Sequence, residues 1–207
     1  MSMNREAGPD SRKSLLAASE RPPSPRERIV AAARDLFYRQ GIRAVGVDAV
    51  AEAAGTNKMT LYRHFSSKDE LVAECLREFA KEAEAGWDTL ARAHPGKPRE
   101  QLRAWLRRMA EHVSSSVERG CALANAAIEL PEKDHPARLV IETFKKAQRE
   151  RLVRLCRDAD LTQPELLADE LFLLLEGARV CCQSIGPEGP GARLVRMGEA
   201  IIGAHVR

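Results

Sequence analysis

The sequence predicts an all-helical protein. Apolar residues recur every three to four positions along most of its 207 residues, and no segment alternates apolar and polar residues as a strand does. Ala, Leu, Arg and Glu are abundant while aromatic residues make up only 4%, a balance that favours helix over sheet. We therefore expect about nine helices, with 44% apolar residues available for a core.

The first helix is predicted directly after a polar segment. Residues 1–23 contain prolines and no sustained periodicity, so we expect a disordered arm there. Ser24-Pro25-Arg26-Glu27 then combines a capping box with proline at the first helical position. The apolar pattern that follows should end at Gly41.

Two short helices are predicted next, at 47–54 and from Asn57 to about Phe65. Gly55 between them can adopt the left-handed conformation of a tight turn, and Asn57 is a good N-cap for the second helix. Leu61 and Phe65 should face the core. Two short helices hinged at a glycine are typical of the helix-turn-helix motif, whose second helix enters the major groove of DNA.

The remaining two thirds of the chain predict a helical bundle. Ser67-Lys68-Asp69-Glu70 is a second capping box, and it opens a helix that should reach about Trp87. Proline- or glycine-rich breaks separate the later helices. We expect these at 99–118, 121–130, 136–155, from 164 and from 194. The chain is thus divided into an arm (1–23), a helix-turn-helix domain that we call the reader (24–67), and a helical domain that we call the body (68–207).

Positive charge is concentrated in the reader. The whole chain has a net charge of +3, but the segment from Arg21 to Lys68 holds nine basic and four acidic residues, a net charge of +5. Phosphate contacts supply much of the affinity of proteins for nucleic acids. The distribution therefore favours a nucleic-acid partner for this segment.

Cysteine usage and hydropathy indicate where the protein works. There are five cysteines, an odd number with no Cys-x-x-Cys pair, and no apolar run is long enough for a signal peptide core or a membrane span. We expect a cytoplasmic protein with free thiols and no membrane partner. No metal site and no cofactor is expected.

One motif carries a family resemblance. The run Ala51-x-x-Ala54-Gly55, followed by Leu61-Tyr62-x-x-Phe65-x-Ser67-Lys68-x-x-Leu71, resembles the DNA-binding domain of the TetR family of transcriptional repressors over residues 24–71. The resemblance implies a homodimer that binds a palindromic operator in double-stranded DNA. It also implies that a small-molecule effector, whose identity the sequence does not give, releases the protein from DNA.

The predicted DNA contacts lie around the second helix of the motif. The first residues of a recognition helix reach base edges, and Lys58 can donate to guanine O6 and N7. The resemblance assigns phosphate contacts to Tyr62 and Lys68. Many family members place Thr or Ser before the first motif helix, where this chain has Val45-Gly46, so we expect Arg43 to substitute. The full predicted set is Arg43, Thr56, Asn57, Lys58, Met59, Thr60, Tyr62, Arg63, His64 and Lys68.

The resemblance also implies an effector pocket in the body. The candidate lining is mixed, which suggests a mainly apolar molecule held by a few polar groups. The candidates are Trp87, Trp105, Met109, His112, Val113, Cys121, Leu123, Asn125, Phe144, Phe172 and Glu176.

The resemblance also implies dimerisation through the last two helices. The helix that starts near residue 164 has a wider apolar surface than a monomer of this size needs, and a two-fold dimer would match a palindromic operator. The predicted interface residues are Leu171, Leu174, Leu175, Ala178, Leu194, Met197 and Ile201.

Three alternatives remain open from the residues alone. The first is a DNA-binding protein without ligand control, such as an activator or a constitutive repressor. Cys121 should begin a helix, where the dipole lowers a thiol pKa, so the protein could be a repressor that senses electrophiles or oxidants; a small buried residue is the other interpretation. An enzyme would need Cys121 to pair with a histidine. There is no nucleophile elbow, phosphate loop or His-Glu-x-x-His motif to organise such a site, so we expect no enzyme.

Overall fold

The structure is a computed structural model that describes residues 22–115 and 120–206. All regular structure in these two ranges is helical, which confirms the predicted fold class. The helices are α1 (Pro25–Gln40), α2 (Val47–Ala53), α3 (Lys58–His64), α4 (Lys68–Ala93), α5 (Pro98–Ser115), α6 (Ala122–Glu129), α7 (Pro136–Asp158), α8 (Pro164–Ile185), the 3-10 turn η1 (Pro190–Arg193) and α9 (Leu194–Ala204). Nearly all of the predicted arm, and residues 116–118 of the predicted fifth helix, lie outside the described residues.

The capping signals explain why the helices begin where they do. At Ser24 the capping box is complete: its Oγ accepts from the N–H of Glu27 at 3.3 Å, and its own N–H donates to the Glu27 carboxylate at 2.6 Å. At Ser67 only one half forms. Its Oγ accepts from the N–H of Glu70 at 3.1 Å, but the Glu70 carboxylate pairs with Arg77 at 2.9 Å instead.

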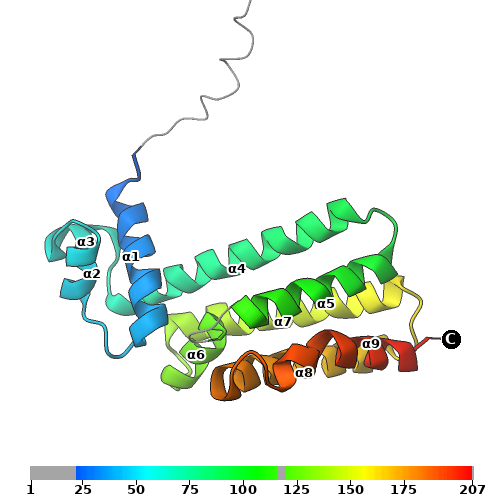
Figure 1. Cartoon of the computed structure of the whole chain (residues 1–207). Coiled ribbons are helices and arrows are strands. Elements are labelled where there is room, and N and C mark those ends of the chain that lie inside the picture. Colours follow the sequence, from blue (N-terminus) through cyan, green and yellow to red (C-terminus); the bar gives the residue numbers. More distant parts are fainter. Residues whose placement is uncertain (1–21, 116–119, 207) are drawn as a thin grey trace, which may run out of the picture.

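The helices form an elongated molecule with the reader at one end. In Figure 1, α1, α2 and α3 gather at the left, α4 runs from them along the body, and α8 and α9 lie along the lower face. Helix α7 packs between α4 and α8, so it forms the centre of the body. The reader therefore reaches the body mainly through α4, α6 and the loop after α1.

Two separate groups of buried side chains form the core. The first core joins the reader to the start of α4, to α6 and to the start of α7; its buried residues run from Ile29 to Leu76 and from Leu123 to Ile141. The second core lies within the body and centres on α5, α7 and α8. The first core contains residues on both sides of residue 67, so the reader and the body share one set of buried side chains. The domain boundary at residue 67 therefore stays a prediction.

The end of α9 is anchored by a histidine. His205 is 7% exposed, and its Nδ1 lies 2.7 Å from the carbonyl oxygen of Thr162 while its Nε2 lies 3.0 Å from the Glu170 carboxylate. The N–H of Thr162 donates to the His205 carbonyl at 2.8 Å. These bonds hold the end of α9 against the connection between α7 and α8.

Two kinds of feature are missing from the described ranges. Within residues 22–115 and 120–206, no group of three or more His, Cys, Asp or Glu side chains could hold a metal ion. The same residues contain no helix with the length and hydropathy needed to cross a bilayer.

The buried thiols should be chemically silent in the folded protein. Burial raises the pKa of Cys75 and of Cys156 to about 12. The reactive thiolate is therefore roughly a thousandfold scarcer than at the ordinary pKa. Iodoacetamide at a pH of about 8.5 should leave Cys75 and Cys156 unlabelled in native protein and label both in guanidinium, as read by mass spectrometry of peptides. The partly exposed Cys121, at the start of α6, is the internal comparison. Equal labelling rates for these three thiols in native protein would contradict this packing.

Candidate nucleic-acid interface

The turn between α2 and α3 is fixed by backbone hydrogen bonds. The N–H of Thr56 donates to the Ala51 carbonyl at 2.9 Å, and the N–H of Gly55 donates to the Glu52 carbonyl at 3.0 Å. Together they form a Schellman motif, which requires a left-handed residue after the helix. Gly55 takes that place with φ +61°, a conformation that side chains resist. The direction in which α3 leaves the turn is thereby set.

Helix α3 is anchored by its cap and by two apolar side chains. Asn57 Oδ1 accepts from the N–H of Thr60 at 2.9 Å, which satisfies one of the free donors at the helix start. Leu61 is fully buried and Phe65 is 3% exposed, so both belong to the first core, as predicted. Arg26 lies over the Phe65 ring and pairs with Glu74 of α4 at 2.6 Å. One face of α3 is thus held by α1 and α4.

The opposite face of α3 carries the predicted contact residues. Met59 is 69% exposed and Tyr62 is 44% exposed, which is high for apolar and aromatic side chains. The exposed members of the predicted set are Asn57, Lys58, Met59, Tyr62, Arg63 and His64, and the half-buried ones are Thr56, Thr60 and Lys68. Nine of the ten predicted residues therefore lie on α3 or directly beside it, with basic, hydroxyl and apolar groups together. Such a mixture can contact both phosphates and base edges.

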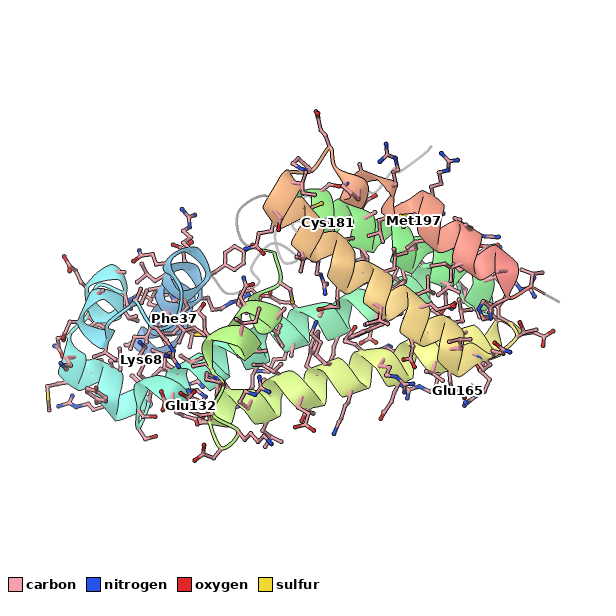
Figure 2. The ribbon with its side chains drawn as sticks, turned by 90° about the horizontal axis from the view of Figure 1, so that it is seen from below. Phe37, Lys68, Glu132, Glu165, Cys181 and Met197 are labelled. Atoms are coloured by element: carbon pink, nitrogen blue, oxygen red, sulfur yellow. The ribbon has the colours of Figure 1, made fainter. Side chains whose placement is uncertain are left out.

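Lys68 occupies the first position of α4. Its Nζ lies 5.9 Å from the centre of the Phe37 ring, and Figure 2 shows the two residues together at the reader end. Burial against this ring lowers the pKa of Lys68, while neighbouring Asp69 and Glu129 oppose the shift. The ammonium group thus sits at a helix start, half-buried, where a phosphate could bind both it and the first N–H groups of α4.

Arg43, the tenth predicted contact residue, is engaged by the body, although its side chain is 63% exposed, and its contact with DNA stays a prediction. Its Nε donates to the Glu129 carbonyl at 2.8 Å and its guanidinium pairs with Glu132 at 3.2 Å. The Glu129 carboxylate also accepts the backbone N–H groups of Ile42 at 2.7 Å and of Arg43 at 3.3 Å. Arg43 therefore joins the α1–α2 loop to the end of α6 rather than standing free beside α3.

A second bond ties the other end of α6 to the reader. Tyr38 of α1 donates its hydroxyl to the Gly120 carbonyl at 3.2 Å. We call these contacts of Tyr38, Ile42 and Arg43 with Gly120, Glu129 and Glu132 the joint; Glu132 is labelled in Figure 2. The sequence analysis missed the joint, because hydrogen bonds between residues 82 to 89 positions apart leave no local pattern.

The predicted effector-pocket residues do not converge on one cavity. A small pocket that is partly open to solvent lies between α1, α4 and α6, and Asn125 is the only predicted residue in its lining. His112 and Val113 line a second, smaller depression with Gly120 and Arg179. Helical spacing correctly identified residues that face the interior of the body. Neighbouring side chains pack against them, however, so they do not line a common cavity.

The other candidates are packed or paired. Trp87 and Trp105 stack at 5.7 Å inside the second core, and Trp87 Nε1 donates to Gln148 at 2.6 Å. Glu176 pairs with Lys145 at 2.7 Å and with Arg179. Met109 and Phe172 pack against the second core, Leu123 and Phe144 belong to or pack against the first, and Cys121 is the half-buried N-cap of α6.

The predicted dimer residues also need correction. Leu171, Leu175, Ala178 and Leu194 are buried inside their own chain, where they form part of the second core. They cannot also present a surface to a second copy. Leu174 and Ile201 are partly buried, and Met197 is 45% exposed. The exposed apolar residues of α8 are the ones beside the predicted positions: Leu166, Leu173, Val180 and Ile185.

Removing the carboxylate at the centre of the joint should destabilise the protein. Glu129→Ala leaves the N–H of Ile42 without its acceptor, and Ile42 is itself 7% exposed. We expect a loss of about 1–3 kcal/mol in the free energy of unfolding, measured by urea denaturation and circular dichroism. Glu132→Ala is the control, because it removes only an exposed ion pair, worth about 0–1 kcal/mol. Equal effects of the two variants would show that the Glu129 bonds do not form in solution.

Comparison with known proteins agrees with this geometry. The family of bacterial regulatory proteins named tetR matches residues 29–75, from α1 to the start of α4. The chain is 40% identical over 73 residues to the transcriptional activator FasR of Mycolicibacterium smegmatis, covering 35% of this chain and 32% of FasR. It is 38% identical over 58 residues to the repressor KstR2 of the same species, covering 28% of each. The matches thus span only about a third of these curated relatives.

A solved structure extends the likeness to most of the chain. A TetR-type transcriptional regulator from Streptomyces avermitilis is 30% identical, with a TM-score of 0.74 over 88% of this chain and 98% of that one. These relatives are regulators, so they favour neither an enzyme nor a sensor built on Cys121. The chain belongs to the TetR family of transcriptional regulators.

Proposed function

We propose that the protein is a homodimeric, sequence-specific DNA-binding regulator that α3 directs to a two-fold symmetric operator. One observation carries this proposal. The Schellman turn fixes the direction of α3, one face of this helix is buried, and six of the predicted contact residues are exposed on or beside the other face. A rigid helix of this kind fits the major groove of DNA. The net charge of +5 between Arg21 and Lys68 supports attraction to phosphates.

Different residues would serve base and phosphate contacts. Lys58 and Met59 open α3, so they would reach base edges, the first as a donor to guanine and the second against a thymine methyl group. Tyr62 and His64 lie further along the helix, and Lys68 begins α4. Their donor groups suit phosphate oxygens, which fix the register of the protein on DNA.

We propose repression as the outcome, with release by a small molecule. The relatives named above include both a repressor and an activator, so the outcome depends on where the operator lies relative to the promoter. Release requires an effector that binds more tightly to the conformation in which the two readers no longer match the operator. An effector with equal affinity for this conformation and the DNA-binding one would not change their populations.

DNA binding is tested with duplexes selected from a random-sequence library. Tyr62→Phe and Lys68→Ala should both weaken binding to selected and shuffled duplexes in a fluorescence anisotropy titration. Only Lys68→Ala removes a cation, so it alone should lower the salt dependence, by about one ion. Lys97→Ala, an exposed lysine beyond α4, is the matched control. If the wild type binds selected and shuffled duplexes equally, the proposed function is wrong.

The exposed face of α8 supports the proposed dimer. Leu166, Leu173 and Val180 follow one another at intervals of seven residues along one side of the helix, and Leu173 is 70% exposed. Nothing lies within 4 Å of the position where Gly177 would carry a side chain, so a second helix can approach there. In Figure 2, Cys181 of α8 and Met197 of α9 lie on neighbouring helices at this side of the body. We propose that a second copy covers this surface; such a dimer needs its two α3 helices about 34 Å apart to enter successive major grooves.

A charge at the centre of this face should separate the dimer. Leu173→Glu acts twice in a symmetric interface, so we expect the dimer dissociation constant to rise by at least about a hundredfold and a monomer mass in light scattering. Leu139→Glu is the control, because Leu139 of α7 is equally exposed, at 71%, on another surface. A dimer mass for Leu173→Glu would contradict the interface. Leu171 is unsuitable for this test, because a charge there would disrupt the second core.

A further inference from the structure

An acidic side chain of α2 contacts the first residue of the recognition helix. Asp48 Oδ2 lies 3.0 Å from Lys58 Nζ, and the side chains are 74% and 51% exposed. We propose that Asp48 is a specificity-determining residue for DNA recognition. Its carboxylate orients the Lys58 ammonium so that it donates hydrogen bonds to bases, and it neutralises the charge that Lys58 would otherwise offer to phosphates. The inference rests on the proposed function of α3.

The pair is too exposed for fold stability to be its main effect. Ion pairs between exposed side chains contribute little to stability, because water screens them and both side chains lose freedom. Helix α2 keeps its other supports without Asp48: Arg28 donates to the Ala54 carbonyl at 3.1 Å, and Val50 and Ala51 are buried. The effect of the pair is therefore expected on the surface that faces DNA.

The chemistry of lysine explains why such a partner matters. Lysine carries three donors on a flexible stem, and unlike arginine it has no planar geometry that selects one acceptor. A free Lys58 could turn to any nearby phosphate. One N–H given to Asp48 leaves two, which matches the two acceptors, O6 and N7, that guanine presents in the major groove. The pair also orders the stem before DNA binds, so less freedom is lost on binding.

The carboxylate affects all sequences, but not equally. A negative charge on the DNA-facing surface is repelled by phosphates on every duplex, so Asp48 lowers affinity for DNA in general. On the operator, the contact between Lys58 and a base offsets this repulsion. Specificity is the difference between the two affinities, so a group that weakens the wrong complexes more than the right one increases it.

The experiment compares two duplexes and five forms of the protein. The duplexes are one selected from a random library and its shuffled counterpart of equal length and composition. The forms are wild type, Asp48→Asn, Lys58→Ala, the double variant of these, and Asp35→Asn. Asp35 is the matched control, because it is an exposed aspartate of the reader that pairs with Arg39 at 2.7 Å within α1. Binding is measured by fluorescence anisotropy at several salt concentrations.

The expected result is a loss of discrimination with a gain in affinity. Asp48→Asn should bind the shuffled duplex about tenfold more tightly and with a steeper salt dependence, while the gain on the selected duplex is smaller. The ratio of the two affinities should therefore fall, whereas Asp35→Asn should leave it unchanged. In the Lys58→Ala background, Asp48→Asn should no longer alter the ratio, because the ammonium that it restrains is absent.

Two results would overturn the inference. One is an unchanged ratio for Asp48→Asn, and the other is the same change of ratio with and without Lys58. Asp48→Ser, which keeps a polar residue in the first turn of α2, repeats the measurement if circular dichroism shows that Asp48→Asn has lost helix. Failure of the proposed function has a different signature, since the wild type itself would then bind both duplexes equally.

Discussion

The burial of Leu61 and Phe65 in the first core is the constraint on which the reader depends. Helix α3 has seven residues, far fewer than an isolated helix needs to be stable in water. Its conformation therefore comes from tertiary packing, in which these two side chains meet α1, α2 and the start of α4. The Schellman turn at Gly55 sets only the local angle. Without the core beneath it, the exposed face of α3 would have no fixed direction.

The same core connects α3 to elements of the body. Leu123 and Ala126 of α6 belong to the first core, and the joint attaches both ends of α6 to α1 and to the loop after it. A displacement of α6 would therefore act on the reader through buried contacts and through hydrogen bonds. Packed interfaces of this kind move as units rather than deforming gradually. This makes α6, beside the pocket lined by Asn125 and Glu129, a second path between body and reader in addition to α4.

Features that depend on residues close together in the chain could be predicted from the sequence. The capping box at Ser24, the turn glycine and the N-cap Asn57 each act over three to five positions, and the structure shows all of them. Glu70 shows the limit of such patterns. It has the spacing of a capping box, but its carboxylate binds Arg77, a partner about two turns further along the helix that outcompetes the local bond.

Contacts between distant segments were not readable in this way. Arg43 looked like a free cation because its partners, Glu129 and Glu132, lie more than 80 positions away. Leu171 looked like an interface residue because α8 is apolar on more than one side. Periodicity shows that a side is apolar, but it does not show whether the same chain or a second copy covers it. Only the packing of α8 against α5 and α7 separates buried Leu171 from exposed Leu173.

The charge of the reader illustrates how the two kinds of information combine. The net charge of +5 between Arg21 and Lys68 is a property of the sequence, but the structure shows that five of the cations in this segment are already paired with carboxylates: Arg26, Arg34, Arg39, Arg43 and Lys58. Lys68, in addition, is half-buried against Phe37. The electrostatic attraction to any DNA duplex is therefore weaker than the net charge suggests, because some of these side chains must break ion pairs with carboxylates of the protein before they can contact phosphates. A reader built in this way gives up general affinity, which depends on charge, and relies more on contacts that only a matching sequence supplies.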